Sequence, residues 1–209
     1  MYFNKLVEQA AVKILIEEYQ ADWVNDFLKE KDIIGLTLIA FSPAIEHIGS
    51  TSVPGLCAKP TIDILVGLQE ESRLDQTISP MIDRGYSYFK KYEPTMPYRR
   101  LFSKLKSLKG KAAPEIIDVN DEFVRGQEFI AVTNIHAVVK DTLHWRRHLA
   151  FRDYLRAHAE VRDEYCRTKK ALSKQEFIDT NEYNAAKDRF IKETQSQALA
   201  WYDAQEKGR

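Results

Sequence analysis

The chain contains only two cysteines and has no excess of positive or negative charge, and each of these features argues against a class of protein. Its two cysteines, Cys57 and Cys166, lie far apart and lack the spacing of a zinc knuckle, which favours a reducing cytoplasm over a metal-stabilised fold. Lys plus Arg and Asp plus Glu each number 31, so bulk charge gives no reason to expect nonspecific binding along a nucleic acid. We therefore expect any attraction for anions to be local.

Long apolar runs are also missing. Residues 1–11 contain one lysine and no such run, which predicts neither a signal peptide nor a membrane anchor. No internal repeat or low-complexity tract is present, and the composition of 44% hydrophobic and 30% charged residues suits one compact unit. These features predict a cytoplasmic protein without a membrane partner.

The most informative segment is residues 45–66, which combines two predicted strands with a glycine–serine turn. It reads IEHIGSTSVPGL and then, after two residues, KPTIDILV. Gly49 leaves no Cβ between the backbone and an approaching anion, while Ser50 and Thr51 add hydroxyl donors beside backbone amides. The turn is therefore a candidate phosphate-binding site, and the alternative is an ordinary tight turn, since Gly-Ser is common in loops.

A carboxylate interrupts the second strand of this segment. Residues 61–66 are β-branched and almost wholly apolar, which is typical of a strand buried on both faces, yet Asp63 lies among them. A buried carboxylate is costly unless it is paired, so Asp63 indicates either a divalent cation such as Mg²⁺ or an ion pair with Lys59 or an arginine. Lys59, just before Pro60, is placed to neutralise phosphate charge.

The periodicity of the rest of the chain predicts an α+β fold. Residues 12–140 form the expected α/β core, in which 106–133 is treated as an insertion, and residues 141–209 form a helical segment packed on the core in the same unit. Inside the insertion, residues 116–119 and 129–132 are expected to make an extra strand pair. Helices are predicted at 22–41, 70–84, 142–158, 160–173 and 180–204, and strands at 12–16, 44–48, 61–68, 86–91, 99–105 and around His136.

Basic side chains from several predicted elements are candidates for one anion pocket. Arg100 and Lys104 share one side of a predicted strand, and the planar fork of Arg152 suits bidentate phosphate contact. Tyr165 and Lys169 lie four residues apart on one helical face, where they would close the far wall. The alternative for such residues is ion pairing along exposed helices.

Three histidines have competing interpretations. His136, in the apolar strand NIHAVV, is either a hydrogen-bonded core histidine or a contact to a ligand. His144 and His148 lie four apart on one helix, a spacing that suits zinc, but no glutamate stands between them in the metalloprotease pattern. Because Arg146 and Arg147 are adjacent, we expect a solvated helix face instead.

The segment HIGSTSVPGLCAKPTIDI closely resembles the signature of the GrpB family, a branch of the nucleotidyltransferase superfamily. A second block, WRRHLAFRDYLR with Glu164, Tyr165 and Lys169 further on, resembles the carboxyl-terminal helical signature of the family. The resemblance covers most of residues 12–205. It implies a small mixed β-sheet of the nucleotidyltransferase type, flanked by helices and followed by carboxyl-terminal helices, in a cytoplasmic bacterial protein.

The resemblance also implies metal-dependent chemistry, from which this chain departs. Catalytic members of the superfamily carry Asp-x-Asp or Asp-x-Glu on the strand after the turn, but the residue that returns to the face of Asp63 is Leu65. Leucine holds no metal. The remaining candidate ligands for Mg²⁺ or Mn²⁺ are Asp63, Glu46 and His136, although Mg²⁺ prefers oxygen to nitrogen.

Two functions remain open, and we favour the first by a narrow margin. The first is transfer of a nucleotidyl or phosphoryl group from a nucleoside triphosphate, with Asp63, Ser50 and Lys59 as catalytic residues. The second is a non-catalytic module that binds a nucleotide or phosphometabolite and lost catalysis with the acid at position 65. The sequence names neither the substrate and acceptor nor the oligomeric state. In both cases the expected ligand contacts are Gly49, Ser50, Thr51, Lys59, Arg100, Lys104, Arg152, Tyr165 and Lys169.

Overall fold

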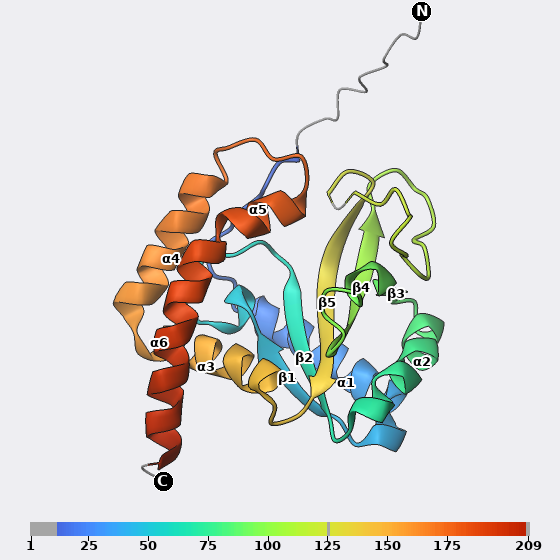
Figure 1. Cartoon of the computed structure of the whole chain (residues 1–209). Coiled ribbons are helices and arrows are strands. Elements are labelled where there is room, and N and C mark those ends of the chain that lie inside the picture. The colour runs from blue at the N-terminus through green and yellow to red at the C-terminus, as the bar shows by residue number, and fades with distance from the viewer. Residues whose placement is uncertain (1–11, 125, 208–209) are drawn as a thin grey trace, which may run out of the picture.

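A five-stranded mixed sheet forms the centre of the structure, a computed structural model that describes residues 12–124 and 126–207 (Figure 1). The strand order is β1-β2-β5-β4-β3, in which β2 and β5 are parallel and every other neighbouring pair is antiparallel. Residues 1–11, for which the sequence predicts neither a signal nor an anchor, lie outside this description. The strands are β1 Ala44–Ile48, β2 Ile62–Leu68, β3 Ser87–Tyr88, β4 Arg99–Ser107 and β5 Phe129–Val139.

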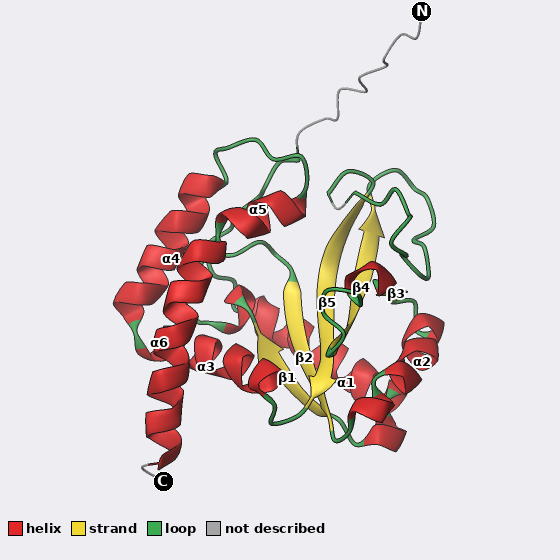
Figure 2. Cartoon of the chain, in the orientation of Figure 1, coloured by secondary structure: helices red, strands yellow, loops and turns green. Residues whose placement is uncertain are grey.

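Helices cover both faces of the sheet and continue beyond it (Figure 2). This arrangement confirms the predicted α+β fold with carboxyl-terminal helices. In residues 12–124 and 126–207, no helix is long and apolar enough to cross a membrane. The helices are α1 Asp22–Thr37, α2 Ile78–Asp83, α3 Leu143–Ala157, α4 Ala159–Leu172, α5 Thr180–Ala186 and α6 Asp188–Lys207.

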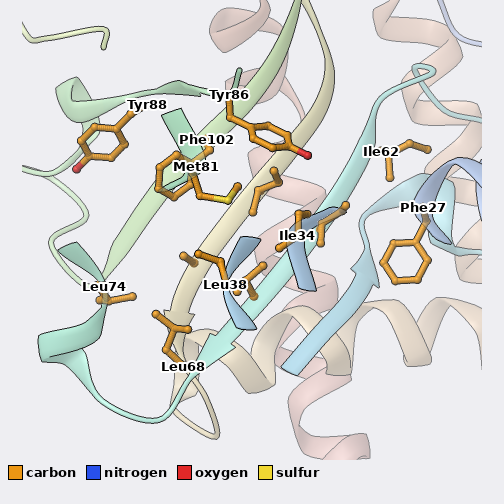
Figure 3. Close-up of a cluster of buried hydrophobic side chains, with 14 of the residues drawn as sticks. Phe27, Ile34, Leu38, Ile62, Leu68, Leu74, Met81, Tyr86, Tyr88 and Phe102 are labelled. Atoms are coloured by element: carbon orange, nitrogen blue, oxygen red, sulfur yellow. The ribbon is translucent and has the colours of Figure 1, made fainter. Parts of the chain in front are cut away.

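One face of the sheet packs on α1 and α2. Side chains alternate along a strand, so every second residue of β2, from Ile62 to Leu68, enters the same apolar cluster. Ile34 of α1 and Met81 of α2 meet them there, with Phe102 from β4, as Figure 3 shows. The cluster supplies the main hydrophobic core and leaves the other face of β2 for the site.

The opposite face of β2 packs on α3 over part of its length. Leu65 is completely buried with Trp145 and Leu149 of α3. Gly67 follows on the same face, where an added Cβ would lie 2.5 Å from the Trp145 ring, so a side chain there would push α3 away. Asp63 is the first residue of this face and lies beyond the apolar contact. The position of α3 therefore leaves one end of the strand open.

A disulfide attaches the carboxyl-terminal helices to the motif loop. Cys57, shortly after the glycine–serine turn, bonds to Cys166 on α4 with 5.5 Å between the Cα atoms. The two residues are 109 positions apart, and no local spacing in the sequence indicates the pairing. The bond holds α4, which carries Tyr165 and Lys169, against the turn.

Several predicted elements differ in the structure. In residues 12–16, predicted as a strand, only Val12 is paired, through an isolated bridge to Phe177. Only Ile78–Asp83 of the predicted helix 70–84 is α-helical, after two short 3₁₀ turns. The predicted helix 180–204 breaks between α5 and α6 at Lys187.

The extra strand pair predicted within 106–133 is wrong. Phe129 and Ile130 belong to β5 and pair with Ser107 and Lys106 at the end of β4. Ile116 makes only an isolated bridge to Tyr88. The long β4–β5 hairpin thus takes up residues 129–132, the second half of the predicted pair, while residues 116–119 lie outside both strands.

Candidate functional site

A cavity of about 720 Å³ lies over the open end of β2. The glycine–serine turn, β5, α3 and the helices from α4 to α6 all contribute to its wall. This volume is typical of a small-molecule site. Of the residues predicted from sequence, the cavity brings together Gly49, Ser50, Thr51, Lys59, Asp63, His136, Tyr165 and Lys169.

The turn and the carboxylate are held in contact by strand register. Ile48, the last residue of β1, pairs with Asp63, so the chain turns directly above the carboxylate. Gly49 has φ 70° and ψ −171°, a combination open almost only to glycine. A Cβ at this position would lie 2.5 Å from Asp63 Oδ2. Glycine is required here by both backbone conformation and space.

A chain of hydrogen bonds orients Asp63. Asn134 Nδ2 donates to Asp63 Oδ1 at 2.9 Å, and Ser103 Oγ donates to Asn134 Oδ1 at 2.8 Å. These residues are neighbours in register across β2, β5 and β4 and therefore share a face. The sequence analysis missed Asn134 and Ser103, although Asn134 lies two residues before His136 and so points to the same side.

His136 lies beside the carboxylate, and its contact with Arg99 indicates the tautomer of its ring. Its Nε2 is 4.0 Å from Asp63 Oδ1, and Arg99 Nη1 lies 3.0 Å from its Nδ1. A guanidinium only donates, so Nδ1 accepts and Nε2 carries the proton of the neutral ring. The N–H thus faces Asp63. His136 thus lines the cavity and is also hydrogen-bonded within the protein, so both interpretations of this residue stay open.

Lys169 is almost fully buried beside the turn, with 2% of its surface exposed. Its Nζ donates to Ser50 Oγ at 2.9 Å and to the carbonyl oxygen of Cys57, and lies 4.3 Å from the centre of the Tyr165 ring. Burial, followed by the charge of Lys187, lowers the pKa of Lys169 to about 6. An anion at the turn would stabilise the charged form of this amine.

Two further lysines share one aromatic ring. Lys187 and Lys59 lie 4.7 Å and 5.3 Å from the centre of the Tyr183 ring. Burial lowers the pKa of Lys187 to about 7, Lys59 adds to the effect, and Asp63 opposes it. Tyr183 lines the cavity with a buried hydroxyl that has no hydrogen-bond partner in the described part of the chain. The helical periodicity of residues 180–204 did not predict that Lys187 lines the cavity, because Lys187 lies at the break between α5 and α6.

Arg147 and His148 of α3 enter the cavity beyond His136. The His136 and His148 ring centres are 5.6 Å apart, and burial, followed by the charges of Arg147 and Arg99, lowers the pKa of His148 to about 3. The predicted solvated face is therefore wrong for His148. His144 also departs from that prediction, because its ring stacks on Tyr98 with the centres 3.4 Å apart.

Arg100 and Lys104 do not reach the cavity, contrary to the prediction. Arg100 Nε pairs with Asp75 at 2.6 Å, and Lys104 Nζ pairs with Glu30 of α1 at 2.6 Å. Strand alternation sends both side chains to the face covered by α1 and α2. Their neighbour Arg99, one residue out of phase, reaches the cavity instead.

Arg152 and Glu46 neutralise each other outside the cavity lining, which corrects the roles predicted for both. Arg152 Nη1 donates to Glu46 Oε2 at 2.7 Å and to the His47 carbonyl at 3.1 Å. Asp153 accepts two further hydrogen bonds from the same guanidinium. Arg152 thus anchors α3 to β1, and Glu46 does not join Asp63.

The predicted metal ligands Asp63, Glu46 and His136 therefore do not form one donor set. Within residues 12–124 and 126–207, no group of three or more His, Cys, Asp or Glu side chains is placed to hold a metal ion. Lys187 near Asp63 adds positive charge where a divalent cation would need negative charge. These residues do not fit the metal site that the superfamily implies.

The Thr51 hydroxyl is engaged away from a ligand. It lies 3.1 Å from His47 Nε2 and donates to the Thr61 carbonyl at 3.3 Å. His47 stacks on Phe27, and burial, with smaller effects of Arg156 and Arg152, lowers its pKa to about 4. Thr51 therefore supports the turn, while Ser50 presents its hydroxyl near Lys169.

Comparisons with known proteins agree with the resemblance seen in the motif. The family model described as "GrpB protein" matches residues 13–197. UPF0157 protein YqkA of Bacillus subtilis is 32% identical over 189 residues, which cover 90% of this chain and 48% of that protein. UPF0157 protein BH1888 of Halalkalibacterium halodurans is 34% identical over 188 residues, covering 90% of this chain and 83% of that protein. The chain thus spans about half the length of the first relative and most of the second.

One solved structure gives the same result for the fold. The crystal structure of conserved protein GrpB from Enterococcus faecalis matches with a TM-score of 0.69 at 30% identity and covers 90% of this chain and 99% of that chain. Cid1, described with an RNA terminal uridylyl transferase activity, matches with a TM-score of 0.45 at 15% identity over 73% of this chain and 40% of that chain, which is too weak to carry an argument. With its sequence matched from residue 13 to residue 197, the chain belongs to the GrpB family.

Proposed function

We propose that the protein binds a phosphorylated ligand of nucleotide size, with a phosphate between the glycine–serine turn and three lysines. The observation that carries the proposal is the convergence of Lys59, Lys169 and Lys187 on the cavity that Ser50 and Asp63 line. Burying ammonium groups side by side is costly unless an anion accompanies them. The lowered pKa values of Lys169 and Lys187, about 6 and about 7, reflect that cost.

Each group has a role in this proposal. Gly49 lets a phosphate oxygen approach the backbone, and Ser50, already hydrogen-bonded to Lys169, donates its hydroxyl. Lys59 and Lys187 neutralise charge from the side of Tyr183. Asp63 repels phosphate, so the phosphate does not contact it directly. Its carboxylate instead accepts a hydrogen bond from a ligand hydroxyl next to the phosphate. The lysines supply the positive charge, and the proposed binding requires no divalent ion.

A second candidate, nucleotidyl or phosphoryl transfer, is favoured by the orientation of Asp63. Asn134 fixes one carboxylate oxygen at 2.9 Å, and the protonated nitrogen of His136 faces the same oxygen. In this scheme an acceptor hydroxyl gives its proton to Asp63, its oxygen bonds to phosphorus, and the bond from phosphorus to the leaving phosphate breaks. The lysines stabilise the charge that develops on the leaving group.

Thermal unfolding with a panel of nucleoside mono-, di- and triphosphates, in EDTA and in Mg²⁺ or Mn²⁺, tests the binding proposal. A ligand at 100 times its Kd stabilises the native state by about 2.7 kcal/mol, which is easily measured. We expect a rise in Tm in EDTA for wild type, and a much smaller one for Lys187→Gln. Lys170→Gln is the matched control, because exposed Lys170 pairs with Glu18 outside the cavity lining.

Absence of any shift, with every ligand and ion, would reject the proposal. A shift that Lys187→Gln and Lys170→Gln reduce equally would place the ligand elsewhere. The transfer candidate is tested separately: the ligand that binds is incubated with acceptor alcohols, and release of the leaving group is followed in wild type and Asp63→Ala. With a nucleoside triphosphate, the leaving group is pyrophosphate for nucleotidyl transfer and the nucleoside diphosphate for phosphoryl transfer. Turnover that Asp63→Ala abolishes, while ligand binding persists, supports the second candidate.

A further inference from the structure

The cavity contains a second cationic group that the proposed phosphate site does not use. Arg99 and Arg147 both line the cavity, on the side of β4, β5 and α3. Arg99 contacts the Nδ1 atom of His136, whereas the Nε2 atom of the same ring faces Asp63. The histidine ring thus separates this guanidinium from the carboxylate. Lys169 and Lys187 lie on the other side, with Ser50 and Asp63.

Arg147 lacks the acidic partner that its neighbour has. Arg146 pairs with Asp203 at 2.6 Å and with Glu206 at 2.9 Å, both on α6. Arg147 has no carboxylate within 4.0 Å in residues 12–124 and 126–207. It lies over the Tyr98 ring at 5.9 Å and reaches the Tyr98 hydroxyl at 3.5 Å, while its buried Nε has no hydrogen-bond partner in those residues. A guanidinium in this state has unused donors in a fork that suits a phosphate or carboxylate.

The charges between the two cationic groups restrict the shape of the ligand. Asp63 interacts with both groups, through the ring of His136 on the arginine side and with the charge of Lys187 on the lysine side. One continuous polyphosphate that touched both groups would pass its negative charge over the Asp63 carboxylate. Two anions joined by a neutral part avoid this repulsion, because the neutral part lies over Asp63 and offers it a hydroxyl. The cavity of about 720 Å³ accommodates a nucleotide-sized molecule of this kind.

We infer that Arg147, with Arg99, binds a second anionic group of the same ligand, so that the ligand carries phosphates or carboxylates at two separated positions, as a nucleoside bisphosphate does. This inference rests on the proposed phosphate site at Ser50 and the lysines. To that proposal it adds the chemical class of the ligand, a molecule with two separated anionic groups. A nucleoside monophosphate occupies only the lysine side, and pyrophosphate does the same.

Calorimetric titration in EDTA with adenosine 3′,5′-bisphosphate, AMP and pyrophosphate tests the inference. A charge-assisted hydrogen bond to a guanidinium is worth a factor of about ten or more in affinity. We expect wild type to bind the bisphosphate at least about tenfold more tightly than AMP. Arg147→Gln removes this advantage and leaves the affinities for AMP and pyrophosphate within about twofold of wild type, because their phosphates contact the lysine side. Arg146→Gln, the matched control, keeps the advantage.

Arg147→Lys retains the positive charge without the planar guanidinium, so it should keep part of the higher affinity for the bisphosphate. This variant also serves as the test if Arg147→Gln fails to fold. Bisphosphate binding no tighter than that of AMP overturns the inference, and so does a loss in Arg147→Gln that is equal for all three ligands. In either case pyrophosphate binding that depends on Lys187 leaves the proposed function standing. If wild type binds none of the three probes although its circular dichroism spectrum is that of a folded protein, both the inference and the proposed function are rejected.

Discussion

The Asp63 carboxylate lies so close to Gly49 that a Cβ at position 49 would stand 2.5 Å from its Oδ2. The contact joins the glycine–serine turn to the acid beside it, and antiparallel pairing of Ile48 with Asp63 keeps the two in register. Any side chain at position 49 would displace the carboxylate or the turn. The geometry of this pair therefore determines both the shape of the anion site and its charge.

Gly49→Ala is expected to destabilise the fold and to abolish anion binding. The φ of 70° and ψ of −171° alone cost a residue with a Cβ about 1–3 kcal/mol, and the clash with Asp63 adds to this cost. Gly85→Ala is the control, because Gly85 also has a positive φ, of 83°, but no atom lies within 4 Å of its added Cβ. Urea unfolding should show a larger loss for Gly49→Ala. Equal losses would mean that backbone strain, not contact with Asp63, explains the glycine.

Asp63→Asn separates electrostatic repulsion from metal ligation. If the lysines hold the phosphate, removing the negative charge leaves anion affinity in EDTA unchanged or higher, since Asp63 and phosphate repel. If Asp63 holds a divalent ion that carries the phosphate, the same change removes a metal-dependent affinity. Titration of pyrophosphate into both proteins, with EDTA and with Mg²⁺, distinguishes the two. Affinity that appears only with Mg²⁺ and disappears in Asp63→Asn would overturn the metal-independent proposal.

The sequence alone predicted the local part of the site well. Residues 44–48 are a strand as predicted, and residues 61–68 differ only by the first residue, because short apolar, β-branched runs bounded by turn residues have few alternatives. Asp63 was identified because a single acid stands out in an apolar strand, and the glycine–serine turn was identified because of the GrpB-like motif around it. Such signals lie within a few residues of one another and do not depend on tertiary structure.

Features that depend on tertiary packing were missed. Both faces of the sheet are covered, so polarity gave no sign that Arg99 faces the cavity and Arg100 faces Asp75. Lys187 ends α5 in the middle of a pattern that reads as one helix, and its placement depends on a cavity assembled from distant segments. The Cys57–Cys166 bond likewise joins residues 109 positions apart. Sequence periodicity contains no information on these contacts.

Anion binding should weaken as the pH rises above 7. The pKa of Lys187 is lowered to about 7 and that of Lys169 to about 6, so both amines are mostly neutral at pH 8.5 in the free protein. A bound phosphate favours the charged amines, and binding near pH 7 to 8 therefore takes up protons. Calorimetry of pyrophosphate binding in buffers of different ionisation enthalpy measures this uptake. Lys187→Gln should reduce it, and pH-independent binding without proton uptake would contradict the lysine assignment.

The same lysines make the unliganded protein more stable as the pH rises. Their pKa values are lower in the folded state than the ordinary value of 10.5, so the unfolded chain binds more protons from about pH 6 to 10.5. Stability therefore increases with pH across this window through these two groups. Urea unfolding at pH 6.5 and 8.5 should show a smaller increase for Lys187→Gln than for Lys170→Gln. A larger or equal increase in Lys187→Gln would contradict the buried position of the amine.

Reduction of the Cys57–Cys166 disulfide should lower stability and loosen the site. The bond closes a loop of 109 residues, for which chain entropy predicts a contribution of about 4–5 kcal/mol, with measured values commonly about 2–5 kcal/mol. The Cys57 carbonyl also accepts a hydrogen bond from Lys169, so greater freedom at Cys57 reaches the anion site. Unfolding of wild type and Cys166→Ser, each with and without dithiothreitol, measures the effect. Wild type that is insensitive to the reductant would mean that the bond contributes nothing in solution.

Leu65→Asp, which introduces the Asp-x-Asp pattern of catalytic nucleotidyltransferases, should destabilise the protein without creating a metal site. Leu65 is completely buried against Trp145 and Leu149 of α3, so a carboxylate there is desolvated in an apolar cluster. Loss of the packed side chain alone costs about 2–5 kcal/mol, and the buried charge adds to it. Leu65→Met, of similar volume, should cost less than about 1.5 kcal/mol. Urea unfolding of both variants, with and without Mn²⁺, measures this difference. Stabilisation of Leu65→Asp by Mn²⁺, together with a gain of metal-dependent turnover, would show instead that α3 can yield and that the native chain is a binding module one carboxylate short of catalysis.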